Sequence, residues 1–341
     1  MPAQARDVKG LDTFRFIAAV CVALSHGAAF PLGEYVKHSS GVAHVLIGIY
    51  HSAFDGPAAV MMFFVISGFC IHYSFACGTP FQSVPFLTRR FLRIIPPLVG
   101  ALLLARVLGK SGALYIILWS VYCELIYYVI YPGLRILFRR YDLRLLIGIS
   151  LTAAILLILS HWDVMFQWEF AVYLAWILGL PAWLLGCLLA EDVANGMKPT
   201  PTPVAIWMMR LGVWAYMAIS TVIAFHAPIK IGYPVVLLPF YLLCYVWLGW
   251  ELRYWQQREP SRFLEWGGKW SYSLYLIHKL PLAMIPAMIA APSLSWVLRI
   301  AAITAASLLF YIAIERPSHR LARSASRWAA SKTASAAGVT F

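Results

Sequence analysis

The stretch from Leu11 to Phe30, LDTFRFIAAVCVALSHGAAF, is a hydrophobic segment with an arginine near its start and a histidine near its end. Ten residues separate Arg15 from His26, and all of them are apolar except Ser25. An α-helix rises about 1.5 Å per residue, so the two side chains would lie roughly 16 Å apart along the axis. The spacing is close to three helical turns, which predicts that both lie on one face. We therefore expect a membrane-crossing helix with a polar residue at each end of one face.

The composition of the whole chain is typical of a membrane protein built from helices. Of its 341 residues, 62% are hydrophobic and 12% are charged. A soluble domain carries about twice that share of charge. Apolar runs of roughly 17–25 residues recur from end to end, which predicts an all-α, polytopic transmembrane bundle. We expect one membrane domain over residues 1–341, with a small, polar and flexible tail from about residue 328 to 341.

The apolar runs predict about ten membrane spans, and most of the 27 lysines and arginines fall in alternate connections between them. The other connections carry only Lys37, Arg106, Lys110 and Lys230. Because cationic residues are enriched in cytoplasmic loops, this asymmetry places both termini in the cytoplasm, as an even number of spans requires. It also explains the net charge of +13 without nucleic-acid binding. The expected spans are roughly 11–30, 58–76, 91–109, 112–138, 143–160, 168–190, 205–226, 231–250, 270–290 and 294–315.

Three ionisable residues lie deep within the expected spans: His26, Glu124 and His278. Such residues are costly in a bilayer and usually face a cavity or a partner. An intramembrane histidine can also serve only as an interhelical hydrogen-bond donor, and Arg15 can extend its side chain to the headgroups. A buried glutamate is harder to explain structurally, because burial disfavours its charged form unless a partner is present. Glu124 is therefore the strongest single candidate for function.

A second polar cluster lies on the predicted cytoplasmic side, where Arg89, Arg90 and Arg93 follow the second span. These arginines could simply anchor a cytoplasmic turn. Alternatively, they could bind phosphate, because the guanidinium group presents a planar fork to phosphate oxygens. The six cysteines form no C-x-x-C pair and have no histidines at ligand spacing, so we expect neither disulfides nor a metal site.

Taken in order, these motifs resemble the acyltransferase-3 family of multipass membrane O-acyltransferases. The resemblance extends over residues 11–317, and its specificity comes from the order of the motifs because each one alone is weak. The matching features are Arg15 and His26; FFVISGF at Phe63–Phe69, followed by Arg90 and Arg93; Trp119, Ser120 and Glu124, followed by Tyr127, Tyr128 and Pro132; SYSLYLIH at Ser271–His278; and Glu315-Arg316-Pro317.

The resemblance implies transfer of an acyl group, usually acetyl from acetyl-CoA, to a hydroxyl of a surface glycan, lipopolysaccharide, exopolysaccharide or glycolipid. It also implies the bacterial plasma membrane as the location. Acetyl-CoA would be a cosubstrate, and no permanently bound cofactor is expected. Several members carry a periplasmic esterase-like domain after the last span; we expect this chain to be a stand-alone member. The acceptor, the length of the acyl group and the oligomeric state stay open.

Roles for individual residues follow from this resemblance and from the predicted topology. Arg15 and the three loop arginines Arg89, Arg90 and Arg93, with Ser67, would bind CoA from the cytoplasmic side. His26 would act as a general base or as a transient acyl carrier, and Glu124 would orient it or stabilise the imidazolium. Substrate contacts are expected from four further residues: Trp119, Tyr122, Tyr275 and His278.

Two other classes of protein remain as alternatives. A proton-coupled transporter or flippase would also place a histidine and a glutamate within the membrane. It would further predict broken helices in two repeated halves, and the sequence has no visible internal symmetry. A structural scaffold would not need the pairing of Arg15 with His26 or of Trp119 with Glu124.

Overall fold

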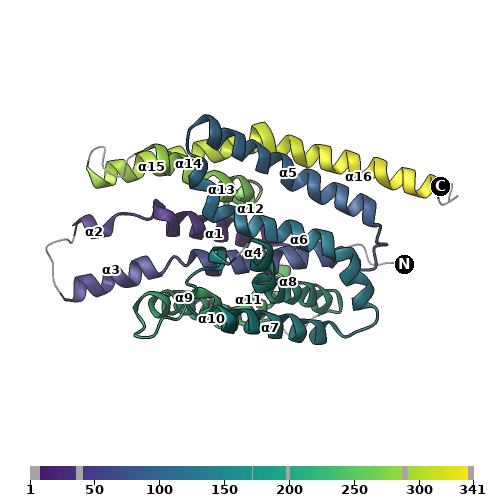
Figure 1. Ribbon diagram of the computed structural model, residues 1–341, viewed down its shortest axis with the longest axis horizontal. Helices are drawn as coiled ribbons and strands as arrows, with labels where there is room; N and C mark the ends of the chain where they lie inside the picture. Colours follow the sequence, from purple (N-terminus) through teal and green to yellow (C-terminus); the bar gives the residue numbers. More distant parts are fainter. Residues whose placement is uncertain (1–7, 36–40, 171, 197–199, 286–290, 337–341) are drawn as a thin grey trace.

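The computed structural model describes residues 8–35, 41–170, 172–196, 200–285 and 291–336, and within these ranges the regular structure is helical (Figure 1). The long helices are α1 (Leu11–Ala23), α4 (Gly56–Ala76), α5 (Ser83–Val107), α6 (Tyr115–Phe138), α7 (Leu143–Ser160), α8 (Val172–Ala194), α9 (Pro203–His226), α11 (Leu238–Gln256), α15 (Pro292–Phe310) and α16 (Arg316–Ala336). The shorter elements are η1 (Leu24–Ala28), α2 (Leu32–Tyr35), α3 (Val42–Ser52), η2 (Ser111–Leu114), η3 (Gln167–Glu169), α10 (Tyr233–Val236), α12 (Arg262–Gly268), α13 (Ser271–Ile277), α14 (Lys279–Met284) and η4 (Tyr311–Glu315).

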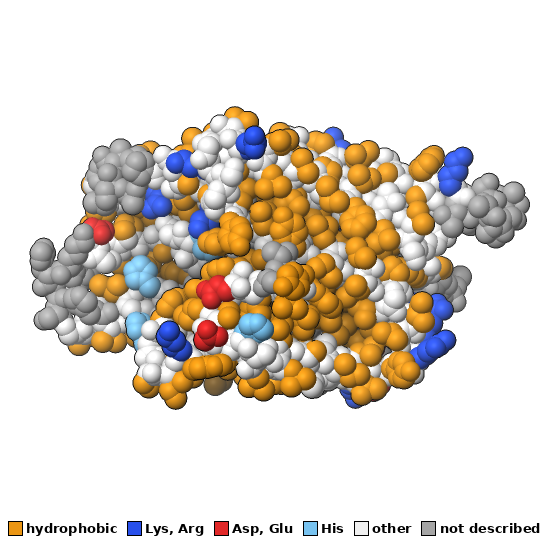
Figure 2. Space-filling view, viewed as in Figure 1, with side chains coloured by type: hydrophobic (Ala, Val, Ile, Leu, Met, Phe, Trp, Pro, Cys, Tyr) orange, Lys and Arg blue, Asp and Glu red, His pale blue; other side chains and the backbone are white. Residues whose placement is uncertain are grey.

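The described residues contain eight helical segments that are long and apolar enough to cross a membrane. Hydrophobic side chains cover most of the middle of the face shown in Figure 2, and most of the lysines and arginines visible there lie toward the two ends. The prediction of an all-α, polytopic integral membrane protein is therefore confirmed. The cytoplasmic position of both termini stays a prediction.

The difference between eight segments and the ten expected spans has two sources. The helix α5 has 25 residues, enough to cross a bilayer, but its first half carries Arg89, Arg90 and Arg93. The expected span 270–290 begins as two short helices, α13 and α14, and residues 286–290 lie outside the described ranges. Pro281 gives a physical reason for this break, because it has no N–H to donate to the carbonyl of Ile277.

The centre of the bundle is the packing of α4 against α8, where two glycines allow the backbones to meet. A Cβ atom at Gly68 would lie 1.9 Å from the carbonyl oxygen of Trp183, and one at Gly186 would lie 2.0 Å from that of Val65. Small residues permit such close approach between membrane helices, which then associate through van der Waals packing. This contact packs α4 closely against α8, and α4 forms one wall of the cavity described below.

One edge of the bundle is formed by α5 and α16, which run side by side (Figure 1). The hydroxyl of Ser326 donates to the carbonyl of Pro85 at 3.0 Å, and that of Ser318 donates to the carbonyl of Leu92. The helix α16 continues to Ala336, so residues 328–336, for which we expected flexibility, are helical. Residues 337–341 lie outside the described ranges.

The first span ends in an irregular turn rather than in a regular helix. From Leu24 the helix widens into the π-type turn η1, where His26 has non-helical angles and Gly27 has a φ of +98°. A positive φ is strained for any residue with a Cβ, which explains the glycine at this position. The expectation that Arg15 and His26 share one helical face is therefore wrong, because the regular helix ends before His26. Residues 31–57, which connect the first two expected spans, contain the helices α2 and α3.

Candidate active site

A cavity of about 110 Å³ lies between α1, α4, α5, α6 and α13 and contains several of the predicted site residues. Its polar lining comes from segments far apart in the sequence, which only the packing of the bundle brings together. The lining residues that carry polar or charged side chains are Arg15, Ser67, Cys70, Arg90, Arg93, Ser120, Glu124, Tyr128, Ser271, Tyr272, Tyr275 and Glu315.

Two arginines of the cavity converge on Cys70 of α4. Nη1 of Arg15 pairs with the carboxylate of Asp12 at 2.7 Å, and its Nη2 donates to Sγ of Cys70 at 3.0 Å. Arg90 donates weakly from Nη2 to the carbonyl of Cys70 at 3.5 Å. Its Nε is buried and has no hydrogen-bond partner. Arg90 therefore keeps donor capacity at the cavity, which is unusual for a buried polar group.

The neighbouring positions of α5 have different exposures. Arg93 also lines the cavity, as the spacing of three residues from Arg90 predicts for one helical face. Arg89 is exposed and is absent from the cavity lining. The predicted group of CoA-binding residues is thus brought together at one cavity, except for Arg89.

Glu124 lies in the cavity wall and is held by two hydroxyl groups. Ser67 of α4 donates to Oε1 of Glu124 at 2.9 Å, and Tyr128, one turn further along α6, donates to the same oxygen. Among the described contacts no hydrogen bond joins Glu124 to His26, whose described partner is His278. Glu124 therefore does not orient His26 through a direct hydrogen bond, and stabilisation of the imidazolium by Glu124 stays a prediction.

The partner of His26 is His278, and the two imidazoles are nearly parallel. Nδ1 of His26 lies 2.9 Å from Nε2 of His278, with an angle of 5° between the rings. His278 is fully buried. Its Nδ1 lies 2.8 Å from the carbonyl oxygen of Tyr275 and 3.1 Å from that of Leu274. This pair was not predicted, although both histidines were predicted site residues.

These contacts determine where the protons of a neutral histidine pair reside. A carbonyl oxygen can only accept, so Nδ1 of His278 carries its hydrogen and Nε2 of His278 has a free lone pair. That lone pair accepts the hydrogen bond from Nδ1 of His26. Nε2 of His26 is then left without a hydrogen and can accept a proton.

The helix α13 connects the cavity to the histidine pair. The hydroxyl of Tyr275 lies 2.5 Å from Oγ of Ser120, and both residues line the cavity. The backbone carbonyl of the same tyrosine holds His278. The cavity wall and the buried histidine are thus one helical turn apart.

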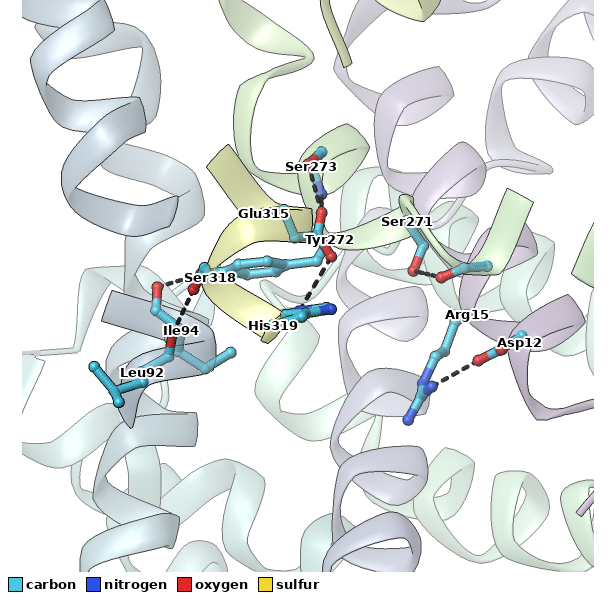
Figure 3. A network of polar contacts seen from close by, with 11 residues as sticks. Asp12, Arg15, Leu92, Ile94, Ser271, Tyr272, Ser273, Glu315, Ser318 and His319 are labelled. Atoms are coloured by element: carbon cyan, nitrogen blue, oxygen red, sulfur yellow. Dashed lines mark hydrogen bonds and ion pairs between the residues drawn. The ribbon is translucent and has the colours of Figure 1, made fainter. Parts of the chain in front are cut away.

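A second carboxylate, that of Glu315, reaches the cavity from η4, between α15 and α16 (Figure 3). Glu315 accepts hydrogen bonds from the backbone N–H of Ser273 at 3.0 Å and from its hydroxyl at 2.5 Å. The imidazole of His319 also approaches this carboxylate, with its Nε2 3.5 Å from Oε1 of Glu315. The hydroxyl of Tyr272 donates to the carbonyl of Ile94 at 3.3 Å.

The sequence alone suggested no role for Glu315, because this residue lies at the end of the last expected span. A continuous helical path through η4 into α16 places it inside the bundle instead. Its signal in the sequence is an acidic residue directly after the apolar run YIAI.

Two residues predicted to contact substrate do not line the cavity. Trp119 is buried and packs edge-to-face against Phe64, with ring centroids 6.1 Å apart. Tyr122 is exposed. Because Ser120 and Glu124 are four residues apart and share a face of α6, Tyr122 between them points away. Trp119 and Tyr122 therefore do not line this cavity, and their contact with substrate stays a prediction.

The comparison with known proteins supports the family resemblance that the order of the motifs indicated. A family model described as an acyltransferase domain matches residues 8–316, a range that includes every residue of the cavity and of the histidine pair. No curated protein and no solved structure matches the sequence.

Proposed function

The chain belongs to the acyltransferase-3 family, and on this premise we propose that it moves an acetyl group from acetyl-CoA to a hydroxyl of a cell-surface glycan or glycolipid. In this proposal the protein acts in the bacterial plasma membrane. The observation that supports it most is the path from an arginine-lined cavity, through Tyr275, to the pair formed by His26 and His278. One end of this path suits phosphate groups and the other end offers a base.

The arginines would bind the phosphates of CoA. Arg15, Arg90 and Arg93 lie at one cavity, and Arg90 has a buried Nε without a partner. A phosphate oxygen would satisfy such a donor, and guanidinium–phosphate pairs are among the strong charge-assisted hydrogen bonds. With CoA held there, its thioester would extend past Ser120 and Tyr275 toward the histidines.

His26 would act as the general base. Its Nε2 takes the proton of the acceptor hydroxyl while that oxygen attacks the thioester carbonyl carbon. The new C–O bond forms, the C–S bond breaks, and the CoA thiolate leaves and takes the proton from the imidazolium. During the reaction, the charge on His26 strengthens the hydrogen bond from its Nδ1–H to His278. The same free Nε2 would also serve the alternative role as acyl carrier.

Glu124 would be a positioning residue in this mechanism. Its carboxylate holds the hydroxyls of Ser67 and Tyr128 and places a negative charge in a cavity that contains three arginines. This balance would keep the arginines oriented toward the cavity before CoA binds.

The proposal is tested with purified protein in maltoside detergent, labelled acetyl-CoA and a panel of glycan acceptors. We expect wild type to bind acetyl-CoA and transfer the label, and His26→Ala to bind acetyl-CoA but transfer about 10²–10⁴-fold more slowly. His161→Ala is the matched control, because His161 is exposed at the end of α7. Mass spectrometry without acceptor distinguishes a base from an acyl carrier, since only a carrier leaves acetyl on His26.

Two results would overturn the proposal. Wild type that neither binds nor consumes any acyl-CoA would favour the transporter alternative. Full transfer activity in His26→Ala would show that another group is the base.

A further inference from the structure

Lys279 directly follows His278 in the sequence, the guanidinium of Arg299 lies close to Gly27, and neither cation lines the arginine-lined cavity. Building on the proposed acyl transfer, we propose that they bind an anionic group of the acceptor, a phosphate or a carboxylate next to the hydroxyl that is acylated. The acceptor would then be an acidic glycan or a phosphate-linked sugar, and neutral sugars would be poor acceptors.

Each cation lies near one histidine of the pair, Lys279 by its place in the sequence and Arg299 by its approach to the turn that carries His26. Lys279 directly follows His278 and begins α14. Nη2 of Arg299, on α15, lies 4.0 Å from the position that a Cβ atom of residue 27 would occupy, and Gly27 directly follows His26.

The turn that carries His26 is held against α15 close to this position. Nε1 of Trp296, one turn before Arg299, donates to the carbonyl of Ala28 at 3.0 Å. Gly27 is exposed and has no side chain, so this residue places no side-chain atoms between the turn and the guanidinium of Arg299. In Figure 2, several lysine and arginine side chains are visible near the part of the molecule where α14 and α15 lie.

Neither cation has an acidic partner among the residues that the structure describes. Within the described ranges, no ion pair involves Lys279 or Arg299, and Nε of Arg299 is buried without a hydrogen-bond partner. Of the acidic residues in the sequence, only Asp7 falls outside the described ranges. Both side chains are only partly exposed. Leaving a guanidinium partly buried and unpaired is unfavourable, and an anionic ligand would remove that cost.

The positions of Lys279 and Arg299 separate these two cations from the proposed CoA site. Arg15, Arg90 and Arg93 line the cavity, whereas Lys279 and Arg299 do not. The two groups of cations are therefore distinct, and the second group lies next to Gly27 and His278. An anion held by Lys279 and Arg299 would place a neighbouring sugar hydroxyl next to His26, while CoA approaches from the cavity.

The first experiment measures ligand binding in maltoside detergent with the CoA site saturated by CoA, so that added phosphate cannot bind there. The probes are glucose 1-phosphate, glucuronate and glucose. Their binding is measured by the broadening of their ³¹P or ¹³C NMR lines. We expect wild type to bind glucose 1-phosphate or glucuronate but not glucose, and the two probes distinguish a phosphate from a carboxylate.

Two double variants test whether Lys279 and Arg299, and not other cations of the protein, bind the acidic probe. In Lys279→Gln/Arg299→Gln we expect binding of the acidic probe to weaken roughly tenfold or more, since two charge-assisted contacts are lost. The matched control is Arg106→Gln/Lys110→Gln, which removes one exposed cation in the last turn of α5 and one just after it, and this variant should bind like wild type. Unchanged CoA affinity shows that each variant is folded.

Three outcomes would overturn the inference: equal binding of glucose and the acidic probes, no binding of either acidic probe, or an unchanged affinity in the double variant. A protein that fails to bind CoA at all would instead contradict the proposed function. The two failures are therefore distinguishable. With acceptors of matched length, wild type should also acetylate the acidic one at a KM at least about tenfold below that of the neutral one.

Discussion

Arg210 and Arg299 both lie within long apolar helices, yet their surroundings differ. Arg210 of α9 donates from Nε and Nη2 to the two oxygens of Glu251 at 2.7 and 2.8 Å, and Trp247 donates to the same carboxylate at 2.9 Å. Arg299 of α15 has no acidic partner among the described residues, and its Nε is unsatisfied. Fixed protein partners fill the donors of Arg210, whereas those of Arg299 are available to a ligand.

The same contrast separates two histidines. His72 uses both ring nitrogens, one toward the hydroxyl of Tyr131 at 2.9 Å and the other toward Glu191 at 3.2 Å. His26 has a described hydrogen bond only at Nδ1, to His278. We infer that saturated polar groups in this bundle maintain the fold and that unsaturated ones take part in chemistry. The following three variants test this distinction.

The largest expected effect is on stability, in Arg210→Gln. It leaves the fully buried Glu251 without its charge partner, which should lower the free energy of unfolding by about 3–5 kcal/mol. Thermal and denaturant unfolding in detergent measure this loss, and the acetyl-transfer rate per folded molecule should stay at the wild-type level. The double variant Arg210→Gln/Glu251→Gln should recover part of the stability, because no unpaired charge remains. Normal stability of Arg210→Gln would contradict the structural role.

The next effect is on catalysis, in His278→Ala. Without the lone pair of His278, nothing fixes the tautomer of His26, and kcat should fall about 10²-fold, equivalent to about 2.7 kcal/mol. His72→Ala is the control, because it removes an equally buried histidine with saturated contacts. Steady-state kinetics should show a normal kcat for folded His72→Ala, and its melting temperature should fall. Equal kcat losses in the two variants would remove the distinction between these histidines.

A smaller effect is expected on cosubstrate affinity, in Arg90→Gln. Loss of one guanidinium–phosphate contact should raise the KM for acetyl-CoA about tenfold with little change in kcat. Arg89→Gln provides the neighbouring control, since Arg89 is exposed and does not line the cavity. If Arg89→Gln had the larger effect on KM, CoA would bind outside this cavity.

Much of the candidate site could be predicted from the sequence, because burial of charge in a membrane is rare and each instance is informative. Arg15, Ser67, Arg90, Arg93 and Glu124 do line one cavity. Glu315 was missed, because hydropathy placed it at the end of a span while the helix in fact continues through it. The break between α13 and α14 was also missed, since an apolar run gives no signal for where hydrogen bonding is interrupted, apart from Pro281.

What the sequence determined by itself is the class of protein: a helical membrane bundle with the ordered motifs of an acyltransferase. Hydropathy and motif order are properties of short segments, so they can be read without knowing which helices touch. Only the tertiary structure decided that His26 pairs with His278, 252 positions away, rather than with Glu124. That choice depends on the π-type turn after α1 and on the break before α14, which aim the two imidazoles at each other. Contacts between distant helices are set by packing and local backbone geometry, and hydropathy carries no information about either.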